Sequence, residues 1–109
     1  MNFKVQGALL DGIHTDFIVA LFENTIFIIV TQNSKLGTFY LYKPECLSTD
    51  DQGYDIKVLF GCEDENLTAG VASLLRALNI DRRVIICLML ENSNFRTIRA
   101  IQEIISNLI

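Results

Sequence analysis

The sequence predicts an α+β fold: a six-stranded antiparallel sheet with two helices on one face. Along the first 60 residues, short apolar runs separated by turn residues indicate five strands. The apolar spacing then changes to the three-and-four period of a helix in two later segments, with one more strand between them. The resulting order is β-β-β-β-β-α-β-α. It fits a single domain over residues 1–109, because domains commonly run to about 100–150 residues.

The first strand is predicted at Phe3–Leu10, because the dipeptide that follows it, Asp11-Gly12, tolerates the positive φ angles of a type I′ turn. The second strand returns along Ile13–Phe22. A third strand at Ile26–Val30 follows after only three polar residues, so the second and third strands are expected to form a β-hairpin.

Both faces of this hairpin are apolar. Cross-strand pairing places one apolar set on one face: Phe17, Val19, Leu21, Ile26, Ile28 and Val30. It places a second set on the other face: Ile18, Ala20, Phe22, Phe27 and Ile29. An antiparallel sheet usually turns one face toward water. A hairpin with two apolar faces therefore indicates that both faces are covered.

Apolar runs and turn residues also predict the remaining strands. A fourth strand at Thr38–Tyr42 follows a polar segment, and the first four strands are expected to form a meander. Lys43–Gly53 contains the only proline and predicts a long exposed loop. In the fifth strand, Tyr54–Phe60, alternation places Ile56, Val58 and Phe60 on one face. The sixth strand, Val84–Leu90, is apolar on both sides and is expected to be central.

Two apolar stripes with helical spacing predict the helices. The first stripe consists of Leu67, Val71, Leu74, Leu75 and Leu78. The second consists of Phe95, Ile98, Ile101, Ile105 and Leu108. Two helices about 10 Å wide cover one face of a six-stranded sheet and leave the other bare.

A like subunit stacked on the bare face would cover it, and about 800 Å² per partner is a standard interface. Aromatic residues are enriched at interface cores. The face that carries two phenylalanines is therefore favoured for dimer contacts, with four expected interface residues: Ile18, Phe22, Phe27 and Ile29.

Composition excludes several function classes. A formal net charge of −4 with a single basic doublet argues against nucleic acid as a partner. No apolar run approaches the roughly 18–20 residues that span a bilayer, and no secretory signal begins the chain, so no membrane association is expected. Cys46, Cys62 and Cys87 form no Cys-x-x-Cys pair, which argues against zinc and disulfides. Reduced thiols predict a cytoplasmic protein, with the nucleus as a further compartment.

No residue pattern in the sequence indicates an enzyme. His14 and Asp16 lie two apart on one side of a strand, and Ser34 or Cys62 could serve as the nucleophile of a hydrolase. A histidine that hydrogen-bonds its neighbour is the simpler interpretation. No phosphate-binding fingerprint occurs, and no catalytic, metal or cofactor residue is assigned.

Two segments resemble a known family. Thr31-Gln32-Asn33-Ser34-Lys35-Leu36-Gly37-Thr38 is similar to the T-Q-x-x-K-[LM]-G-T segment of proteasome assembly chaperone 3. Lys57-Val58-Leu59-Phe60-Gly61, followed by Glu63-Asp64-Glu65, resembles the K-V-L-L-G-x-[DE] stretch before that family's first helix. The resemblance covers roughly Ile13 to Leu108, apart from the loop at Lys43–Gly53.

The resemblance implies a non-enzymatic chaperone whose sheets stack in an α/β/β/α sandwich. It implies pairing with itself or with a proteasome assembly chaperone 4-like paralogue, and binding of a proteasome α subunit during α-ring assembly of the 20S core particle. Lys35, Leu36 and Gly37 are the expected client-binding residues. The alternative is a small dimeric scaffold of roadblock or longin type in trafficking or signalling, although those folds place a helix between early strands.

Overall fold

A computed structural model of the chain describes residues 2–32, 37–44, 54–61, 65–78, 80, 82–90 and 95–109. Within these residues, six strands and two helices have the following bounds: β1 Asn2–Leu10, β2 Ile13–Leu21, β3 Thr25–Gln32, β4 Thr38–Pro44, β5 Tyr54–Phe60, α1 Glu65–Leu78, β6 Arg83–Met89 and α2 Phe95–Leu108. The element order is the predicted one.

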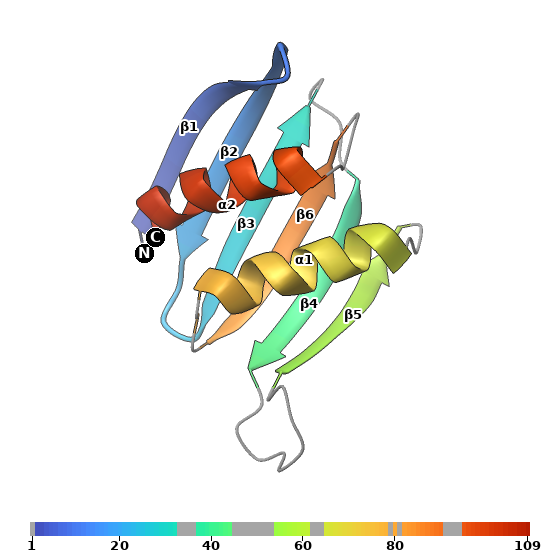
Figure 1. Cartoon of the computed structure of the whole chain (residues 1–109). Coiled ribbons are helices and arrows are strands. Elements are labelled where there is room, and N and C mark those ends of the chain that lie inside the picture. Colours follow the sequence, from blue (N-terminus) through green and yellow to red (C-terminus); the bar gives the residue numbers. More distant parts are fainter. Residues whose placement is uncertain are drawn as a thin grey trace.

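The strands form one sheet in the order β1-β2-β3-β6-β4-β5 (Figure 1). The predicted meander is therefore wrong beyond β3, because β6 inserts between β3 and β4. It pairs parallel to β3 and antiparallel to β4. The sheet is thus mostly antiparallel with one parallel pair, and β6 is central as its doubly apolar sequence predicts.

The link between β1 and β2 is the predicted two-residue turn. Asp11 and Gly12 both have positive φ angles, 53° and 79°. Two successive positive φ angles define a type I′ turn, whose twist matches that of the flanking strands. The β1–β2 register runs without interruption from this turn, with Leu10 opposite Ile13.

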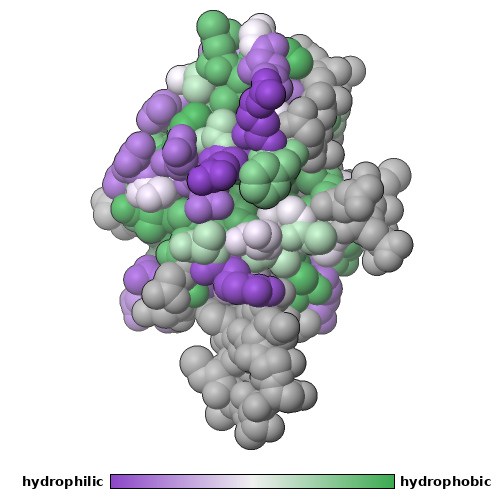
Figure 2. Space-filling view, viewed as in Figure 1, coloured by the Kyte–Doolittle hydropathy of each residue, from purple (hydrophilic) through white to green (hydrophobic). Residues whose placement is uncertain are grey.

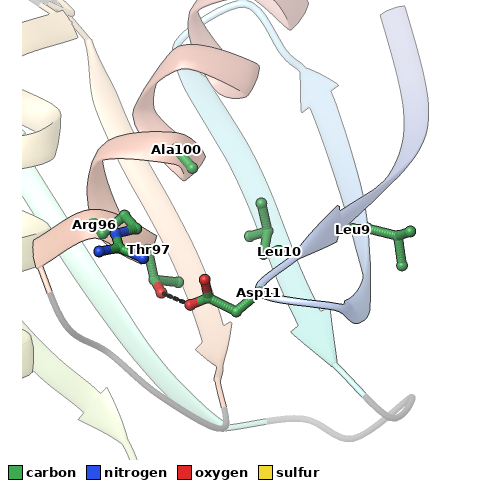
Figure 3. Close-up of a pocket in the computed structure, with 6 residues that line it drawn as sticks. All are labelled: Leu9, Leu10, Asp11, Arg96, Thr97 and Ala100. Carbon is green, nitrogen blue, oxygen red and sulfur yellow. Dashed lines mark hydrogen bonds between the residues drawn. The ribbon is translucent and has the colours of Figure 1, made fainter.

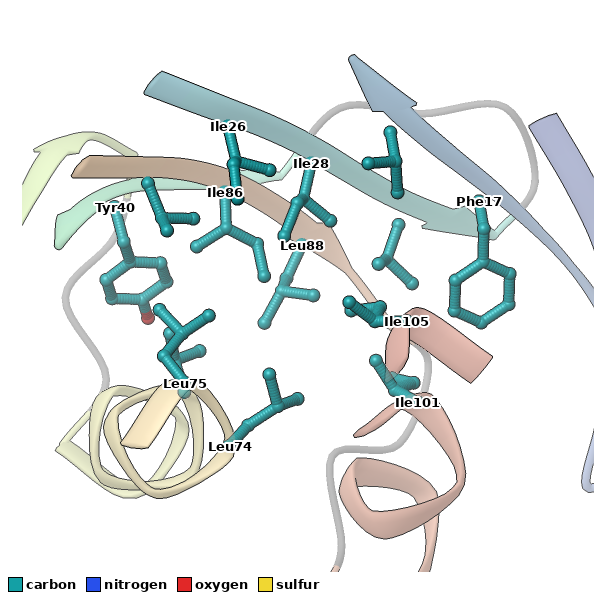
Figure 4. Close-up of a cluster of buried hydrophobic side chains, with 14 of the residues drawn as sticks. Phe17, Ile26, Ile28, Tyr40, Leu74, Leu75, Ile86, Leu88, Ile101 and Ile105 are labelled. Carbon is teal, nitrogen blue, oxygen red and sulfur yellow. The ribbon is translucent and has the colours of Figure 1, made fainter. Parts of the chain in front are cut away.

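Both helices pack on the same face of the sheet (Figure 1). The core lies between them and that face, where the inward side chains of β2, β3, β6 and β4 meet the apolar stripes of α1 and α2 (Figure 4). Leu74 and Leu75 of α1 and Ile101 and Ile105 of α2 are fully buried there. Tyr40 is also fully buried, and its hydroxyl accepts a hydrogen bond from Thr68 at 3.4 Å.

Two side chains depart from the predicted pattern. Phe95, expected in the buried stripe of α2, is 78% exposed, and Thr97 lies buried in the first turn instead. Phe60, expected to share a face with Ile56 and Val58, lies opposite Phe39, because the β4–β5 register shifts between Phe39 and Tyr40. In such a bulge two residues of one strand oppose one of its partner, so alternation breaks at that point.

No helix in the described part of the chain is long and apolar enough to cross a membrane. The end of α2 lies near the start of β1 (Figure 1).

Candidate functional site

The face of the sheet opposite the helices, called the helix-free face, carries two adjacent rows of mostly apolar side chains that cross the sheet from β1 to β5. Directly opposed residues of neighbouring strands share a face, so the register defines rows of side chains across the sheet. One row, the first rung, takes one residue from each strand: Val5, Ile18, Ile29, Cys87, Phe39 and Phe60. The next row, the second rung, contains Phe3, Ala20, Phe27, Ile85, Leu41 and Lys57. Eleven of these twelve residues are apolar.

The edges of this face are strongly exposed. On β1, Phe3 is 61%, Val5 62% and Leu9 71% exposed, and on β5 Phe60 is 71% exposed. Monomeric proteins rarely leave a continuous apolar surface of more than a few hundred Å² open to water, and larger ones usually mark binding sites. The helix side, by contrast, mixes hydrophilic and apolar residues (Figure 2).

Three of the four expected interface residues lie in these rungs. Ile18 opposes Ile29, and Phe27 lies in the neighbouring row, opposite Ala20. Phe22 directly follows β2, is 44% exposed, and its N–H donates to the Thr25 carbonyl oxygen at 2.9 Å. The structure therefore brings Ile18, Phe27 and Ile29 together on the bare side of the hairpin. Their contact with a second subunit stays a prediction.

Sequence reasoning missed the half of this face that β4, β5 and β6 supply. Phe39 and Phe60 pack edge to face there, with ring centroids 6.3 Å apart and ring planes at 67°. Simple alternation assigns Phe60 to the helix side, and only the bulge turns it toward Phe39. The signal in the sequence was the apolar outer set of the central strand, Ile85, Cys87 and Met89.

Cys87 occupies the middle of the first rung, between Ile29 and Phe39, and is fully buried. Burial raises the pKa of its thiol above the ordinary value of 9.0, and a hydrogen bond from the backbone N–H of Gly37 offsets part of this rise. The thiol is therefore protonated at neutral pH.

Gly37 lies where the chain has no room for a side chain. A Cβ atom there would collide with the carbonyl group of Leu88 on β6. Gly61 is constrained in the same region, since it has a φ of 109° and a Cβ there would lie 2.9 Å from Cα of Thr38. Both segments that carry the resemblance thus contain a glycine that packs against a neighbouring strand. Lys35 and Leu36, the other expected client contacts, lie outside the described residues.

The His14 imidazole and the Asp16 carboxylate are joined by a hydrogen bond of 2.8 Å between Nε2 and Oδ1. Both side chains are well exposed, at 66% and 41%. This is the hydrogen bond to a neighbouring residue that the simpler interpretation predicts. Ser34 and Cys62, the proposed nucleophiles, lie outside the described residues. Among the residues that are described, no three His, Cys, Asp or Glu side chains are grouped to hold a metal ion.

Comparisons with known proteins agree with this architecture. Residues 28–108 match the family model of proteasome assembly chaperone 3. The proteasome assembly chaperone 3 of Bos taurus is 30% identical over 112 residues, which cover 96% of this chain and 90% of that protein. Its namesake from Nematostella vectensis is 33% identical over 67 residues, covering 53% of this chain and 50% of that protein.

The fold also has a counterpart among solved structures. A chain in the "Crystal Structure of a Novel Chaperone Complex for Yeast 20S Proteasome Assembly" superposes with a TM-score of 0.78 at 14% identity, covering 99% of this chain and 98% of that one. This likeness shows a shared fold. From the family match and the bovine relative, the chain belongs to the proteasome assembly chaperone 3 family.

Proposed function

We propose that this chain is a non-enzymatic chaperone of 20S proteasome assembly that acts as a dimer and binds a proteasome α subunit. The second subunit is either another copy or a proteasome assembly chaperone 4-like paralogue, stacked on the helix-free face. The dimer would then be an α/β/β/α sandwich with both helix layers outside. Family membership supports the role, and the yeast structural neighbour comes from a chaperone complex for 20S proteasome assembly.

The observation that carries the dimer is the pair of apolar rungs. A sheet face with eleven apolar residues in two adjacent rows is too apolar to serve as a solvated surface. Stacking a second sheet about 10 Å away would bury both rungs. At about 25 cal/mol per Å², burying about 800 Å² on each partner gives a gross gain larger than the cost of association.

The segment of Lys35, Leu36 and Gly37 is proposed to contact the client. Its described residue, Gly37, directly precedes β4 and packs on Leu88 near the end of β6. Loops positioned by a rigid sheet commonly carry binding residues. We place the activity in the cytoplasm, and also in the nucleus, because the cysteines show no disulfide pattern.

Pull-down of the tagged chain from its own cells, followed by mass spectrometry, tests this function. We expect an α subunit together with a second copy of the chain or a paralogue. A second, differently tagged copy expressed in the same cells distinguishes these two dimers. Recovery without any α subunit or assembly factor would contradict the proposal.

A further inference from the structure

The first turn of α2 exposes an aromatic side chain that the helix could have buried. Phe95 is the most exposed large apolar side chain in the described part of the chain, at 78%. Thr97 takes the buried position, and its hydroxyl donates to the Asp11 carboxylate at 3.2 Å. This contact ties the start of α2 to the β1–β2 turn. Phe95 is thus held facing solvent by a fixed helix, on the side of the sheet away from the proposed dimer interface.

Two arginines flank this side chain. Arg96 and Arg99 are exposed, and Arg99 lies one turn after Phe95, hence on the same side of the helix. Neither forms an ion pair with another described residue, and the first turn of α2 contains no acidic residue. The positive end of the helix dipole adds to their charge. Two guanidinium groups therefore flank the exposed aromatic ring, while the nearby Asp11 carboxylate accepts the hydrogen bond from Thr97 on the pocket side and Glu103 follows Arg99 by one turn.

A small pocket lies beside the patch. Its volume is about 150 Å³, and it lies between the β1–β2 turn and the first turns of α2 (Figure 3). Its lining residues are Leu9, Leu10, Asp11, Arg96, Thr97 and Ala100. Cofactor and drug-like sites commonly occupy about 300–1,000 Å³, so this pocket is too small for them. It has room for one aliphatic side chain of a protein partner.

We infer that this patch, Phe95, Arg96 and Arg99 with the adjacent pocket, is a second part of the client-binding surface and docks an acidic segment of the α subunit. Phe95 packs as an aromatic anchor, the two guanidinium groups pair with carboxylates, and the pocket takes a neighbouring aliphatic side chain. Aromatic residues and arginine are the types most enriched at interfaces. The inference rests on the proposed function.

The position of the patch supports this assignment. The N-terminus of α2 lies at the end of the sheet where β3 and β6 finish and β4 begins (Figure 1). Gly37, the described part of the expected client loop, packs on β6 at that same end. One client could therefore contact both places, while the helix-free face holds the second chaperone subunit.

The test uses the full-length chaperone dimer and the α subunits of the same organism, purified and offered one at a time in a biosensor assay. We expect the double variant Arg96→Glu/Arg99→Glu to weaken binding of the client at least about tenfold, because each charge is reversed against an acidic partner. Phe95→Ser should weaken it by a similar factor through loss of the anchor. Raising the salt concentration should weaken binding of the unmodified dimer more than that of the double variant.

The control is Lys4→Glu, which is compared with the single variant Arg99→Glu. It makes the same change in net charge at an exposed position on β1, and it should leave client binding within about twofold. Sedimentation should show an unchanged dimer for every variant, since these positions lie off the helix-free face. Unchanged binding by the double variant would overturn the inference alone. Failure of the unmodified dimer to bind any α subunit would overturn the proposed function as well.

Discussion

Phe60 lies opposite Phe39 on the helix-free face, with the two rings edge to face at 6.3 Å. This pair completes the first rung at the β5 edge, because the bulge turns Phe60 away from the side that alternation assigns to it. A ring that is 71% exposed contributes little to the stability of one subunit. We expect it to contribute mainly to the proposed dimer interface.

Phe60→Ala is accordingly expected to weaken dimerisation more than folding. Loss of the aromatic pair costs the fold about 0.5–1.5 kcal/mol, whereas the dimer dissociation constant should rise about tenfold. Phe95→Ala is the matched control, since Phe95 is similarly exposed but lies on the helix side. Equal dissociation constants for the two variants, measured by sedimentation equilibrium, would show that Phe60 is outside the interface.

Two glycine-to-alanine substitutions should shift stability in opposite directions. Gly37→Ala forces a methyl group into the Leu88 carbonyl and should destabilise the fold by about 1–3 kcal/mol. Gly70 lies inside α1, where a Cβ would make an ordinary contact of 3.5 Å with Ile98, so Gly70→Ala should stabilise by about 0.4–1 kcal/mol. Urea unfolding at equal protein concentration measures both. A destabilised Gly70→Ala would mean that the helices pack more tightly than described.

The Cys87 thiol should react slowly in the native protein. Its pKa is raised by burial, so the reactive thiolate is scarce at pH 8. The native state holds this proton more tightly than the unfolded chain does. The stabilisation that this protonated thiol provides to the native state is thus complete below the ordinary pKa of 9.0. It is lost as the pH rises through the higher pKa of the native protein.

Iodoacetamide labelling of a Cys46→Ser/Cys62→Ser variant isolates Cys87. We expect labelling at pH 8 to be much slower than for the same variant in urea, and native labelling to accelerate only above about pH 9. Native labelling as fast as labelling in urea would show that this thiol is open to solvent rather than buried between Ile29 and Phe39.

A buried polar pair on the helix side should contribute to stability. Gln32 is 2% exposed, and its Nε2 donates to the Thr15 hydroxyl at 2.9 Å, which itself donates to the Ile13 carbonyl at 3.1 Å. Thr15→Val should cost about 1–3 kcal/mol, because it removes a partner from buried polar groups. Thr15→Ser keeps the hydroxyl and should cost only about 0.8 kcal/mol for the lost methyl group. Equal unfolding midpoints for the two variants would contradict this role.

Local patterns in the sequence predicted most of the fold. Pairing across the short polar link predicted the two faces of the β2–β3 hairpin, where Phe17 opposes Val30 and Ile18 opposes Ile29 as expected. Helical spacing placed Leu74, Leu75, Ile101 and Ile105 in the core. These features depend on neighbours a few residues apart, which is the range over which periodicity carries information.

The features that were missed depend on contacts between distant segments. Insertion of β6 between β3 and β4 joins strands more than 40 residues apart, and no local pattern specifies it. The bulge reverses the face of Phe60 by one extra residue, so alternation fails there. Helical spacing allowed Phe95 in the buried stripe, but the first turn is anchored by Thr97 against Asp11, which leaves Phe95 outside.

Sedimentation of the unmodified chain beside Phe27→Asp tests whether the helix-free face holds a second subunit, with Phe95→Asp as the control on the helix side. We predict that the unmodified chain and the control sediment at about twice 12.3 kDa at micromolar concentration. Phe27→Asp should be monomeric or insoluble, because it places an unpaired charge in the second rung of the interface. A stable, soluble monomer for the unmodified chain would contradict the account, since it would leave the helix-free face open to water.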